Sequence, residues 1–260
     1  MKLGLARGES GVAGAQAIRR AMDVIRAIAR LQRSDASLSR VAHATGLNQS
    51  TAFRILKSLV EERMLYYDEV ARTYHLGVLA FELGLAAGGK SRVQEFYLPA
   101  VEEIAARTRL TTYLMARSDT EAVCLLCKEG AAVIRAKPIE VGQRLPLGIG
   151  GGSVAILATL DDDEIKEVLA AQEYDFDLFP GGRDEMARIL DRVEGVRQNG
   201  YSISSGSVAS GVCGIGVPVL PQRGLMQLAV SVSAVTDVVT PQEAKTIAGI
   251  IKSAIGKLPA

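Results

Sequence analysis

A short turn centred on Gly46 constrains this chain most, because two amphipathic segments meet there within a few residues. The segment before it, residues 37–45, carries apolar side chains at helical spacing. A glycine directly after the last helical turn is a common stop, since it tolerates positive φ. Asn48 then favours the start of a second helix over residues 49–63. Two helices joined this tightly are typical of a helix-turn-helix.

The segments on either side predict a winged form of this motif. Residues 16–31 have the pattern of an amphipathic helix, with arginines on one side. Its expected apolar face consists of Ile18, Met22, Ile25, Ile28 and Ala29. Residues 64–76 surround a polar turn at 68–72, which predicts a β-hairpin. The alternative is a small helical bundle with polar outer faces, which the helix period and the glycine turn alone do not exclude.

Polar residues at the start of the 49–63 helix favour DNA binding over that alternative. The first turns of the second helix reach the base edges in such motifs. Here they carry amide, hydroxyl and guanidinium groups, and the first acid is Glu61 at the far end. We expect Arg54 to reach a base edge and Arg72, in the hairpin turn, to contact the DNA backbone or the minor groove. The predicted DNA-binding residues are Gln49, Ser50, Thr51, Arg54, Lys57 and Arg72.

The charge of the chain differs between its two parts. Residues 1–90 carry 13 Lys and Arg against 8 Asp and Glu, a balance of +5, whereas residues 91–260 have a balance of −4, which leaves the net charge of +1. A basic first third fits a polyanionic partner such as double-stranded DNA. The split therefore indicates that the two parts bind different partners.

The length of 260 residues and the 48% share of hydrophobic residues predict a globular chain of two domains. We expect a flexible tail over 1–13, the winged helix-turn-helix domain over 14–78, a linker helix over 79–98 and a second domain over 99–260. The helical pattern continues to residue 108 with an expected break at Pro99. The apolar linker helix suits a dimer interface, and covering its own domain is an equal alternative.

The second domain mixes strands and helices without regular βαβ alternation, which predicts an α+β fold with a mainly antiparallel sheet. The expected strands cover 112–116, 122–128, 132–138, 201–205, 212–220 and 225–234, with a further extended segment at 144–147. The expected helices cover 154–160, 161–170, 183–198 and 241–257, and the last begins with a capping box at Thr240. The helix 183–198 is expected to bury Met186, Ile189, Leu190, Val193 and Val196.

A glycine-rich run, residues 148–153, precedes the predicted helix 154–160. Backbone amides at a helix N-terminus bind anions, and glycines leave those amides uncovered. The run lacks the Gly-Lys-Ser/Thr ending of a nucleotide P-loop, so a carboxylate fits it better than a triphosphate. The alternative is that the glycines only permit a tight loop.

Ser231 and Ser233 alternate along one predicted strand, so both hydroxyls point to the same face. Two hydroxyls on one face are suited to hydrogen bonds with the polar group of a small molecule. Cross-strand pairing or a solvated face is the alternative.

Cys124 and Cys127 have C-x-x-C spacing, but the sequence does not complete a metal site. Zinc needs further ligands, and the other candidates are Cys213, His43 and His75, both histidines being in the other domain. Positions three apart in a regular strand also face opposite sides. Buried thiols are the expected role, with a redox switch as the alternative. Because the second domain has no His to act as a general base, we predict neither an enzyme nor a cofactor.

No uninterrupted apolar run approaches the roughly 20 residues of a membrane helix. The first residues also lack the apolar core of a secretory signal. We therefore expect a cytoplasmic protein with reduced cysteines and no membrane contact.

Two groups of motifs occur along the chain in a specific order and spacing. The first is Thr45-Gly46-Leu47-Asn48-Gln49-Ser50-Thr51-Ala52-Phe53-Arg54-Ile55-Leu56, then Leu59 and the hairpin end Tyr74-His75-Leu76-Gly77. The second comprises Val141-Gly142, Arg144-Leu145-Pro146-Leu147, Gly211-Val212, Gly216-Val217-Pro218-Val219 and Ser231-Val232-Ser233. Together they make the chain resemble the IclR family of bacterial transcriptional regulators from about residue 15 to residue 258.

The resemblance implies a winged-helix DNA-binding domain, a linker helix and a GAF/profilin-like effector-binding domain. It also implies a homodimer or a dimer of dimers that binds operator DNA and responds to a small metabolite, often an organic or aromatic acid. In that family the Ser-x-Ser strand lines the effector pocket. The predicted effector-binding residues are Leu145, Gly148, Ile149, Gly150, Gly151, Gly152, Ser153, Cys213, Ser231 and Ser233.

The chain departs from the family pattern in two places. Acidic residues common in the family are replaced by Ser204, Ser205 and Ser207, and its usual His and Thr are replaced by Gly148 and Gly150. The loss of the acids favours an anionic effector. A rival hypothesis is a small-molecule or redox sensor whose helical head binds a protein, and salt separates the two because DNA binding falls steeply with ionic strength.

Overall fold

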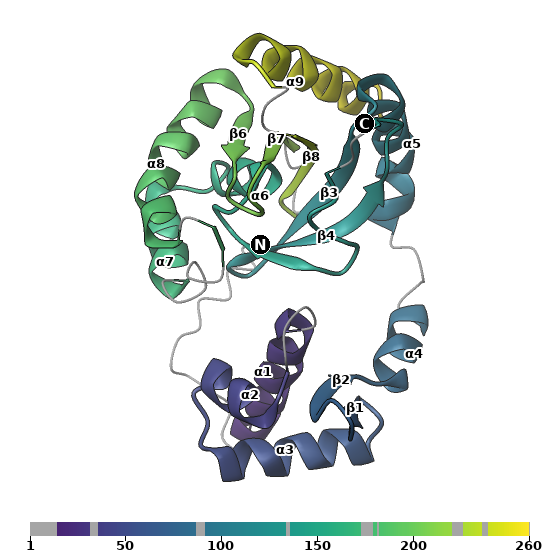
Figure 1. Ribbon diagram of the computed structural model, residues 1–260, viewed down its shortest axis with the longest axis vertical. Coiled ribbons are helices and arrows are strands. Elements are labelled where there is room, and N and C mark those ends of the chain that lie inside the picture. Colours follow the sequence, from purple (N-terminus) through teal and green to yellow (C-terminus); the bar gives the residue numbers. More distant parts are fainter. Residues whose placement is uncertain are drawn as a thin grey trace. The chain divides into compact units, whose positions relative to one another are not determined.

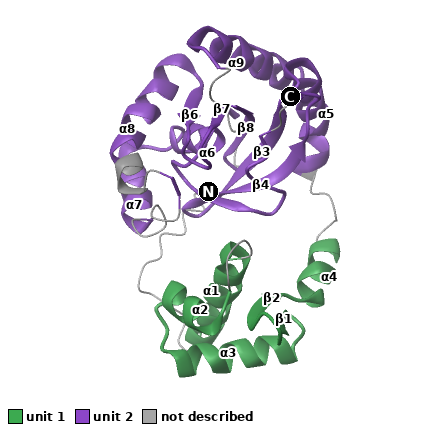
Figure 2. Cartoon of the chain, viewed as in Figure 1, with its two compact units in different colours: residues 1–89 green, residues 90–260 purple. Residues whose placement is uncertain are grey.

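The computed structural model describes residues 15–31, 36–86, 92–133, 136–172, 179–180, 182–219, 226–235 and 239–259 (Figure 1). The chain forms two compact units, residues 1–89 and residues 90–260 (Figure 2). The expected tail 1–13 and the expected turn 221–224 lie outside the described residues.

Unit 1 holds the predicted helix-turn-helix and hairpin. Its elements are α1 (Gln16–Leu31), α2 (Leu38–Thr45), α3 (Gln49–Glu61), β1 (Leu65–Asp68), β2 (Thr73–Leu76) and α4 (Val78–Ala86). Two local signals form the turn between α2 and α3: Gly46 takes φ 65°, and the Asn48 side chain accepts a hydrogen bond from the Thr51 N–H. The strands β1 and β2 pair antiparallel and make the wing. The predicted architecture of this unit is therefore confirmed.

The core of unit 1 lies between α1, α2, α3 and the wing. Its buried residues are Val24, Ile28, Ala36, Val41, Leu56, Leu65 and Tyr74. The predicted apolar face of α1 is wrong in its first half, because Ile18 and Met22 are 68% and 42% exposed. The buried residues of α1 all lie in its second half. The predicted end of α3 was two residues too late, since the helix stops at Glu61.

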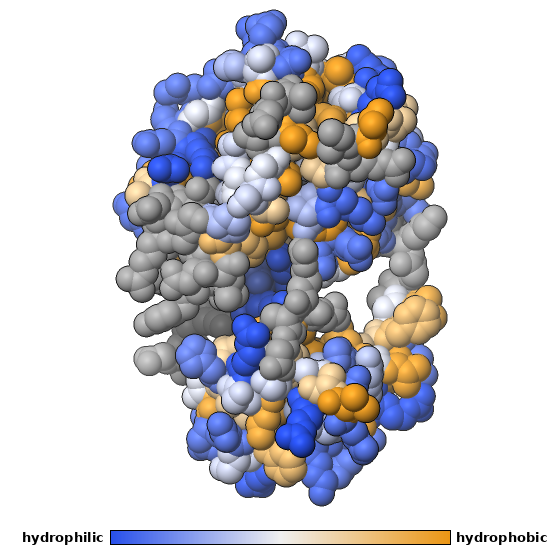
Figure 3. All heavy atoms as spheres, viewed as in Figure 1, coloured by the Kyte–Doolittle hydropathy of each residue, from blue (hydrophilic) through white to orange (hydrophobic). Residues whose placement is uncertain are grey.

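The helix α4 contacts β1 but buries none of its own residues. Its exposed apolar side chains are Val78, Phe81, Leu83 and Leu85. Figure 3, in which apolar residues are orange, shows apolar side chains gathered over this helix. Unit 1 thus ends in a helix whose apolar surface is uncovered within the part of the chain that the structure describes.

Unit 2 is built around one six-stranded antiparallel sheet. Its strands are β3 (Thr111–Ser118), β4 (Glu121–Lys128), β5 (Arg144–Pro146), β6 (Ser202–Ser205), β7 (Val212–Val219) and β8 (Leu228–Val235), in the order β5-β4-β3-β8-β7-β6. Its helices are α5 (Arg92–Thr108), α6 (Gly151–Leu157), α7 (Asp162–Ala171), α8 (Gly182–Asn199) and α9 (Pro241–Gly256). All five strand pairings are antiparallel, which confirms the predicted α+β class and sheet type.

Two hydrophobic clusters cover the two faces of this sheet. Along β3, Tyr113 and Met115 belong to the first cluster, whereas Leu114 and Ala116 belong to the second. The first cluster includes residues of α6, α7 and α8, and the second includes residues of α5 and α9. The helices accordingly lie on opposite sides of the sheet (Figure 1).

The predicted break at Pro99 is wrong, because this proline lies inside α5. A proline within a helix loses a backbone hydrogen bond and crowds the preceding turn. Tertiary packing compensates here: Val101, Ile104 and Ala105 are at most 2% exposed, and α5 lies against α9, β3 and β4.

Three other predictions for unit 2 are wrong. The described residues of the segment 132–138 join no strand ladder, and β4 pairs with β3 and β5 instead. The helix α6 begins at Gly151, three residues before its predicted start, so part of the glycine-rich run is helical. Leu190 of α8 is 56% exposed, although it was expected in the core. Among the described residues, no helix is long and apolar enough to cross a membrane.

Candidate functional site

The exposed side of α3 carries most of the predicted DNA-binding residues. Gln49, Ser50, Arg54 and Lys57 are exposed, and Thr51 is half-buried. The Ser50 hydroxyl donates to Asn48 Oδ1 at 2.8 Å, so its proton is already used by the capping side chain. Lys57 Nζ lies 3.9 Å from a carboxylate oxygen of Glu61. Arg54 makes no hydrogen bond or ion pair with another described residue, which leaves its guanidinium free for a ligand.

Arg72, the sixth predicted DNA-binding residue, lies in the turn of the wing. The Asp68 carboxylate accepts hydrogen bonds from the N–H groups of Val70 and Ala71, both at 2.9 Å. Arg72 follows with φ 56°, a conformation that non-glycine residues rarely adopt. Its side chain is exposed beside the tip of the hairpin.

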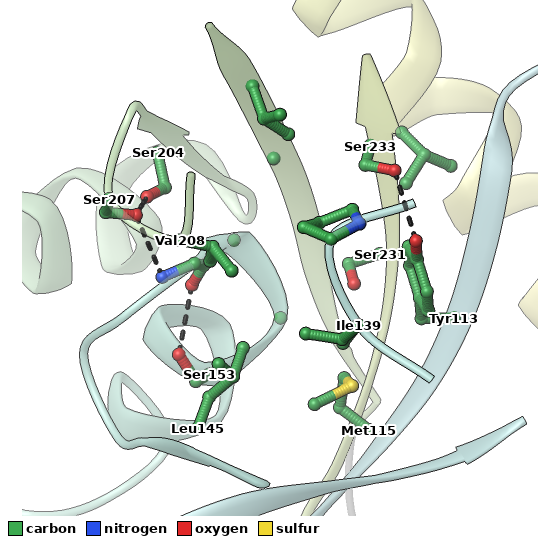
Figure 4. A pocket seen from close by; sticks show the side chains of 17 residues that line it. Tyr113, Met115, Ile139, Leu145, Ser153, Ser204, Ser207, Val208, Ser231 and Ser233 are labelled. Carbon is green, nitrogen blue, oxygen red and sulfur yellow. Dashed lines mark hydrogen bonds between the residues drawn. The ribbon is translucent and has the colours of Figure 1, made fainter. Parts of the chain in front are cut away.

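A cavity lies in unit 2, on the face of the sheet that the first hydrophobic cluster covers (Figure 4). Its lining residues are Tyr113, Met115, Pro138, Ile139, Leu145, Gly150, Gly151, Gly152, Ser153, Ser204, Ser207, Val208, Val212, Gly214, Ser231, Val232 and Ser233. The cavity is tight, with a volume of about 40 Å³. A ligand of several carbon atoms therefore requires the walls to move apart.

One wall of the cavity carries hydroxyls from β3 and β8. The Ser233 hydroxyl donates to the carbonyl of Ala136, so the Tyr113 phenol, 3.3 Å away, donates to Ser233 Oγ. Burial raises the pKa of the Tyr113 phenol well above its usual range, which keeps it protonated. The Ser231 hydroxyl makes no hydrogen bond with another described residue. Its proton is available to a ligand.

The opposite wall carries hydroxyls from β6, the loop after it and α6. Ser207 Oγ accepts a hydrogen bond from the Gly150 N–H at 3.1 Å and also bonds to the Ser204 hydroxyl. Whichever serine donates in that pair, one of the two hydroxyl protons remains unused. The Ser153 hydroxyl donates to the carbonyls of Ile149 and Gly150, so it serves the turn before α6. This wall therefore also offers one donor to a ligand.

Charged side chains are absent from the described residues that line the cavity. Arg144, which precedes the lining residue Leu145, forms an ion pair with Glu121 at 2.9 Å and donates to Ser118 Oγ. A bound molecule would meet hydroxyl donors in apolar surroundings.

Two family models match this chain. The model described as "Bacterial transcriptional regulator IclR C-terminal" matches residues 87–258, and the "IclR helix-turn-helix domain" matches residues 17–69. The first alone covers more than half of the chain. The chain belongs to the IclR family of transcriptional regulators. It is a DNA-binding regulator, as its relatives are, and not an enzyme.

Two relatives of this IclR-family regulator have sequences that align with it over most of their length. The transcriptional regulator KipR of Bacillus subtilis is 24% identical over 203 residues, which cover 78% of this chain and 80% of KipR. The repressor AllR of Escherichia coli (strain K12) is 25% identical over 223 residues, 85% of this chain and 80% of AllR.

Solved structures of other IclR-family proteins share the fold. A regulator from Brucella abortus has a TM-score of 0.78 at 19% identity and covers 99% of this chain and 96% of its own. A homolog from Microbacterium hydrocarbonoxydans, solved with 4-hydroxybenzoate, has a TM-score of 0.66 at 20% identity and covers 92% of this chain and 96% of its own.

Within the regulator's cavity, the structure brings together seven of the ten predicted effector-binding residues. These are Leu145, Gly150, Gly151, Gly152, Ser153, Ser231 and Ser233. Ile149 is fully buried in the first cluster instead, and Gly148 faces Ile189 of α8. Cys213 belongs to the second cluster, because alternation along β7 directs its neighbours Val212 and Gly214 to the cavity.

Several lining residues were missed by the sequence reasoning. Tyr113 and Met115 lie on the same face of β3, and Tyr113 is the cross-strand partner of Ser231. Alternation predicts that these two share a face, but one sequence does not reveal which strand pairs with β8. Ser204 and Ser207 also line the cavity, although the sequence identifies them only as departures from the family pattern.

The two cysteines of the C-x-x-C motif face the same side, contrary to the regular alternation assumed for them. The register between β3 and β4 shifts between Leu114 and Met115, and this bulge places both Cys124 and Cys127 with the first cluster. Burial raises the pKa of the Cys124 thiol to about 12, and burial also raises that of Cys127. Both groups therefore remain thiols at neutral pH.

Proposed function

We propose that this IclR-family regulator binds operator DNA through α3 and the wing, and that a small organic or aromatic acid in the cavity of unit 2 controls that binding. The contacts assigned to DNA are those of Gln49, Ser50, Thr51, Arg54, Lys57 and Arg72. The acid is the effector that the resemblance to the family favours.

The observation that carries the effector proposal is the presence of two unused hydroxyl donors on opposing walls. One belongs to Ser231, and the other belongs to the pair Ser204–Ser207. A carboxylate has only acceptor oxygens, so it complements donors of this kind, and hydrogen bonds to a charged acceptor are stronger than neutral ones. Apolar walls such as Met115 and Ile139 suit the hydrocarbon part of the molecule.

The tightness of the cavity links binding to a change of structure. Entry of a ligand must move the walls of the cavity apart, since it now has room for only a few water molecules. A ligand that binds better to the open form shifts the protein toward that form. We propose that the open and closed forms differ in operator affinity.

We also propose that the regulator acts as a homodimer or a dimer of dimers that uses the exposed apolar side of α4. Phe81 and Leu85 are 66% and 54% exposed there, and a second copy offers an identical surface for burial. Analytical ultracentrifugation should detect a smaller species for Phe81→Glu, while Val70→Glu at the exposed tip of the wing should keep the size of the wild type. Equal sizes for all three proteins would contradict the use of α4.

Isothermal titration of the full chain tests the effector proposal, with organic acids, aromatic acids and matched neutral analogues as ligands. Loss of a hydrogen bond to a charged group costs about 1.5–3 kcal/mol, so Ser231→Ala should raise the Kd of the bound acid roughly tenfold to a hundredfold. The matched control is Ser205→Ala, because Ser205 is exposed on β6 and does not line the cavity. Its Kd should equal that of the wild type.

Two results would contradict the effector proposal. One is stronger binding of a neutral apolar analogue with no effect of Ser231→Ala. The other is an acid that binds in the cavity but leaves the operator affinity of the full chain unchanged. Operator affinity itself should fall steeply with salt, as expected for contacts to phosphates.

A further inference from the structure

Phe53 is an exposed aromatic residue in the middle of an otherwise polar helix surface. It is 48% exposed and lies one turn after Gln49 and Ser50 and one turn before Lys57. Its neighbour Arg54 is exposed as well. The ring therefore belongs to the same side of α3 as the groups assigned to DNA.

The core of unit 1 does not account for this ring. The third hydrophobic cluster takes Leu56 as a buried member from α3 and Ile55, Leu59 and Val60 as partly buried ones, and Phe53 is in neither group. No aromatic or cation–π partner of Phe53 occurs among the described residues. Removing the ring should therefore leave the packing of unit 1 intact.

The polar residues beside Phe53 differ in what they can offer to a base. The Ser50 proton is used by Asn48, and Lys57 is close to Glu61. Three residues in the first two turns of α3 have exposed side chains that make no hydrogen bond to another described residue: Gln49, Phe53 and Arg54. Gln49 can make a pair of hydrogen bonds with adenine, and Arg54 can make a pair with guanine.

Phe53 can contribute only apolar contact. In the major groove the one apolar group on a base edge is the 5-methyl group of thymine, and phenylalanine is among the side chains that contact it. Covering the methyl group with the ring removes apolar surface of both from water. We propose that Phe53 recognises a thymine in each operator half-site by contact with its methyl group. This inference rests on the proposed binding of operator DNA by α3, which we place in the major groove as the second helix of such motifs is placed.

The test uses the full chain and double-stranded DNA that the wild type selects from a random-sequence pool. Each thymine of the selected site is replaced in turn by deoxyuridine, which removes only the methyl group, and the Kd is measured at fixed salt. We expect one thymine per half-site whose replacement weakens binding roughly fourfold, the effect of uncovering about one buried methylene-sized group. This part of the test needs no protein variant.

The second part repeats the measurements with Phe53→Ala and Phe53→Leu. On the thymine site Phe53→Ala should lose affinity about as much as the methyl deletion does, and it should no longer distinguish thymine from deoxyuridine at that position. Phe53→Leu should keep part of the discrimination. The matched control is Lys57→Ala on the same helix side, which should weaken binding while the sensitivity to deoxyuridine remains.

The outcomes separate this inference from the proposed function. If Arg54→Ala and Lys57→Ala weaken binding but the deoxyuridine effect is equal for wild type and Phe53→Ala at every position, the thymine contact is refuted and the placement of α3 stands. If no substitution on α3 changes DNA affinity, both are refuted. Loss of methyl discrimination confined to Phe53 variants supports the contact.

Discussion

Gly151 and Gly214 bring the start of α6 into close contact with β7. A Cβ atom at position 151 would lie 2.7 Å from the carbonyl carbon of Gly214, a distance that backbone atoms cannot accommodate without movement. This closeness, rather than an open set of amides, explains why a glycine is required at position 151. The φ values that favour glycine occur before the helix, at Gly148 and Gly150.

We therefore expect Gly151→Ala to lower the free energy of unfolding by about 1–3 kcal/mol, as overpacking of a core does. Gly195→Ala is the matched control, because Gly195 also lies within a helix and an added Cβ there meets no described atom within 4 Å. That change should be neutral or stabilise the protein by up to about 1 kcal/mol. Denaturant unfolding measures both, and equal effects would argue against the contact with Gly214.

Arg54 is the residue of α3 that we propose to contact a guanine edge. Arg54→Ala should weaken operator binding by about 1–3 kcal/mol, most strongly for the site that contains the contacted guanine. The melting temperature should stay unchanged, because Arg54 is exposed and has no described partner. Arg20→Ala on α1, also exposed, is the control for a general loss of positive charge. An operator footprint that is identical in the wild type and Arg54→Ala would remove this residue from the interface.

At the scale of elements, the sequence predicted best the helices whose ends carry their own signals. The caps at Asn48 and Thr240 stand where their side chains indicated, and Gly46 ends α2 in the left-handed conformation expected of it. Such signals act through bonds between neighbouring residues, so one sequence is enough to recognise them.

The errors arise where distant packing decides the outcome. Pro99 stays helical because α5 is buried against other elements, and Ala136 serves as an acceptor for Ser233 rather than as part of a strand. Ile18 and Leu190 follow the helical period but face away from the cores that formed. For the cavity, the two serines of β8 were predictable from alternation, whereas their partner strand β3 and the positions of Ser204 and Ser207 depend on the strand order.

The capping box of α9 gives a test at this scale. Thr240 Oγ1 accepts from the Glu243 N–H at 3.3 Å, and the Glu243 carboxylate accepts from the Thr240 N–H at 2.7 Å. Thr240→Ala should lower the free energy of unfolding by about 1 kcal/mol, and Thr240→Ser should preserve most of it. Denaturant midpoints at equal slope provide the comparison, and identical midpoints for the two variants would contradict the role of the hydroxyl.

The pH dependence of the stability gives a second test of the same capping box. The backbone hydrogen bond from Thr240, together with that from its hydroxyl, lowers the pKa of Glu243. A lowered carboxyl pKa contributes stability above the unfolded-state value, and this is lost as the pH falls through the folded-state value. The stability difference between the wild type and Glu243→Gln should accordingly shrink under acidic conditions.

At the scale of the whole molecule, the two units have separate hydrophobic cores. The third cluster lies in unit 1, and the first two lie in unit 2. A fragment of residues 91–260 should therefore fold cooperatively and bind the effector with the Kd of the full chain, but it should not bind the operator. Circular dichroism melting and titration check this expectation. A fragment that does not fold would show that unit 2 depends on unit 1.

The sheet of unit 2 separates the effector cavity from the helix that follows unit 1 in the chain. Ser231 lines the cavity, while its neighbour Val230 faces the second cluster, where Ile104 of α5 lies. If the proposed acid binds in this cavity and controls operator binding, the effect is a coupling free energy between the two sites, and it is reciprocal. If the acid weakens operator binding by some factor, the operator weakens acid binding by the same factor. We therefore expect that substitutions on the reverse face, which touch neither ligand, can change the size of that factor, so that an altered regulator keeps both affinities and still loses its response.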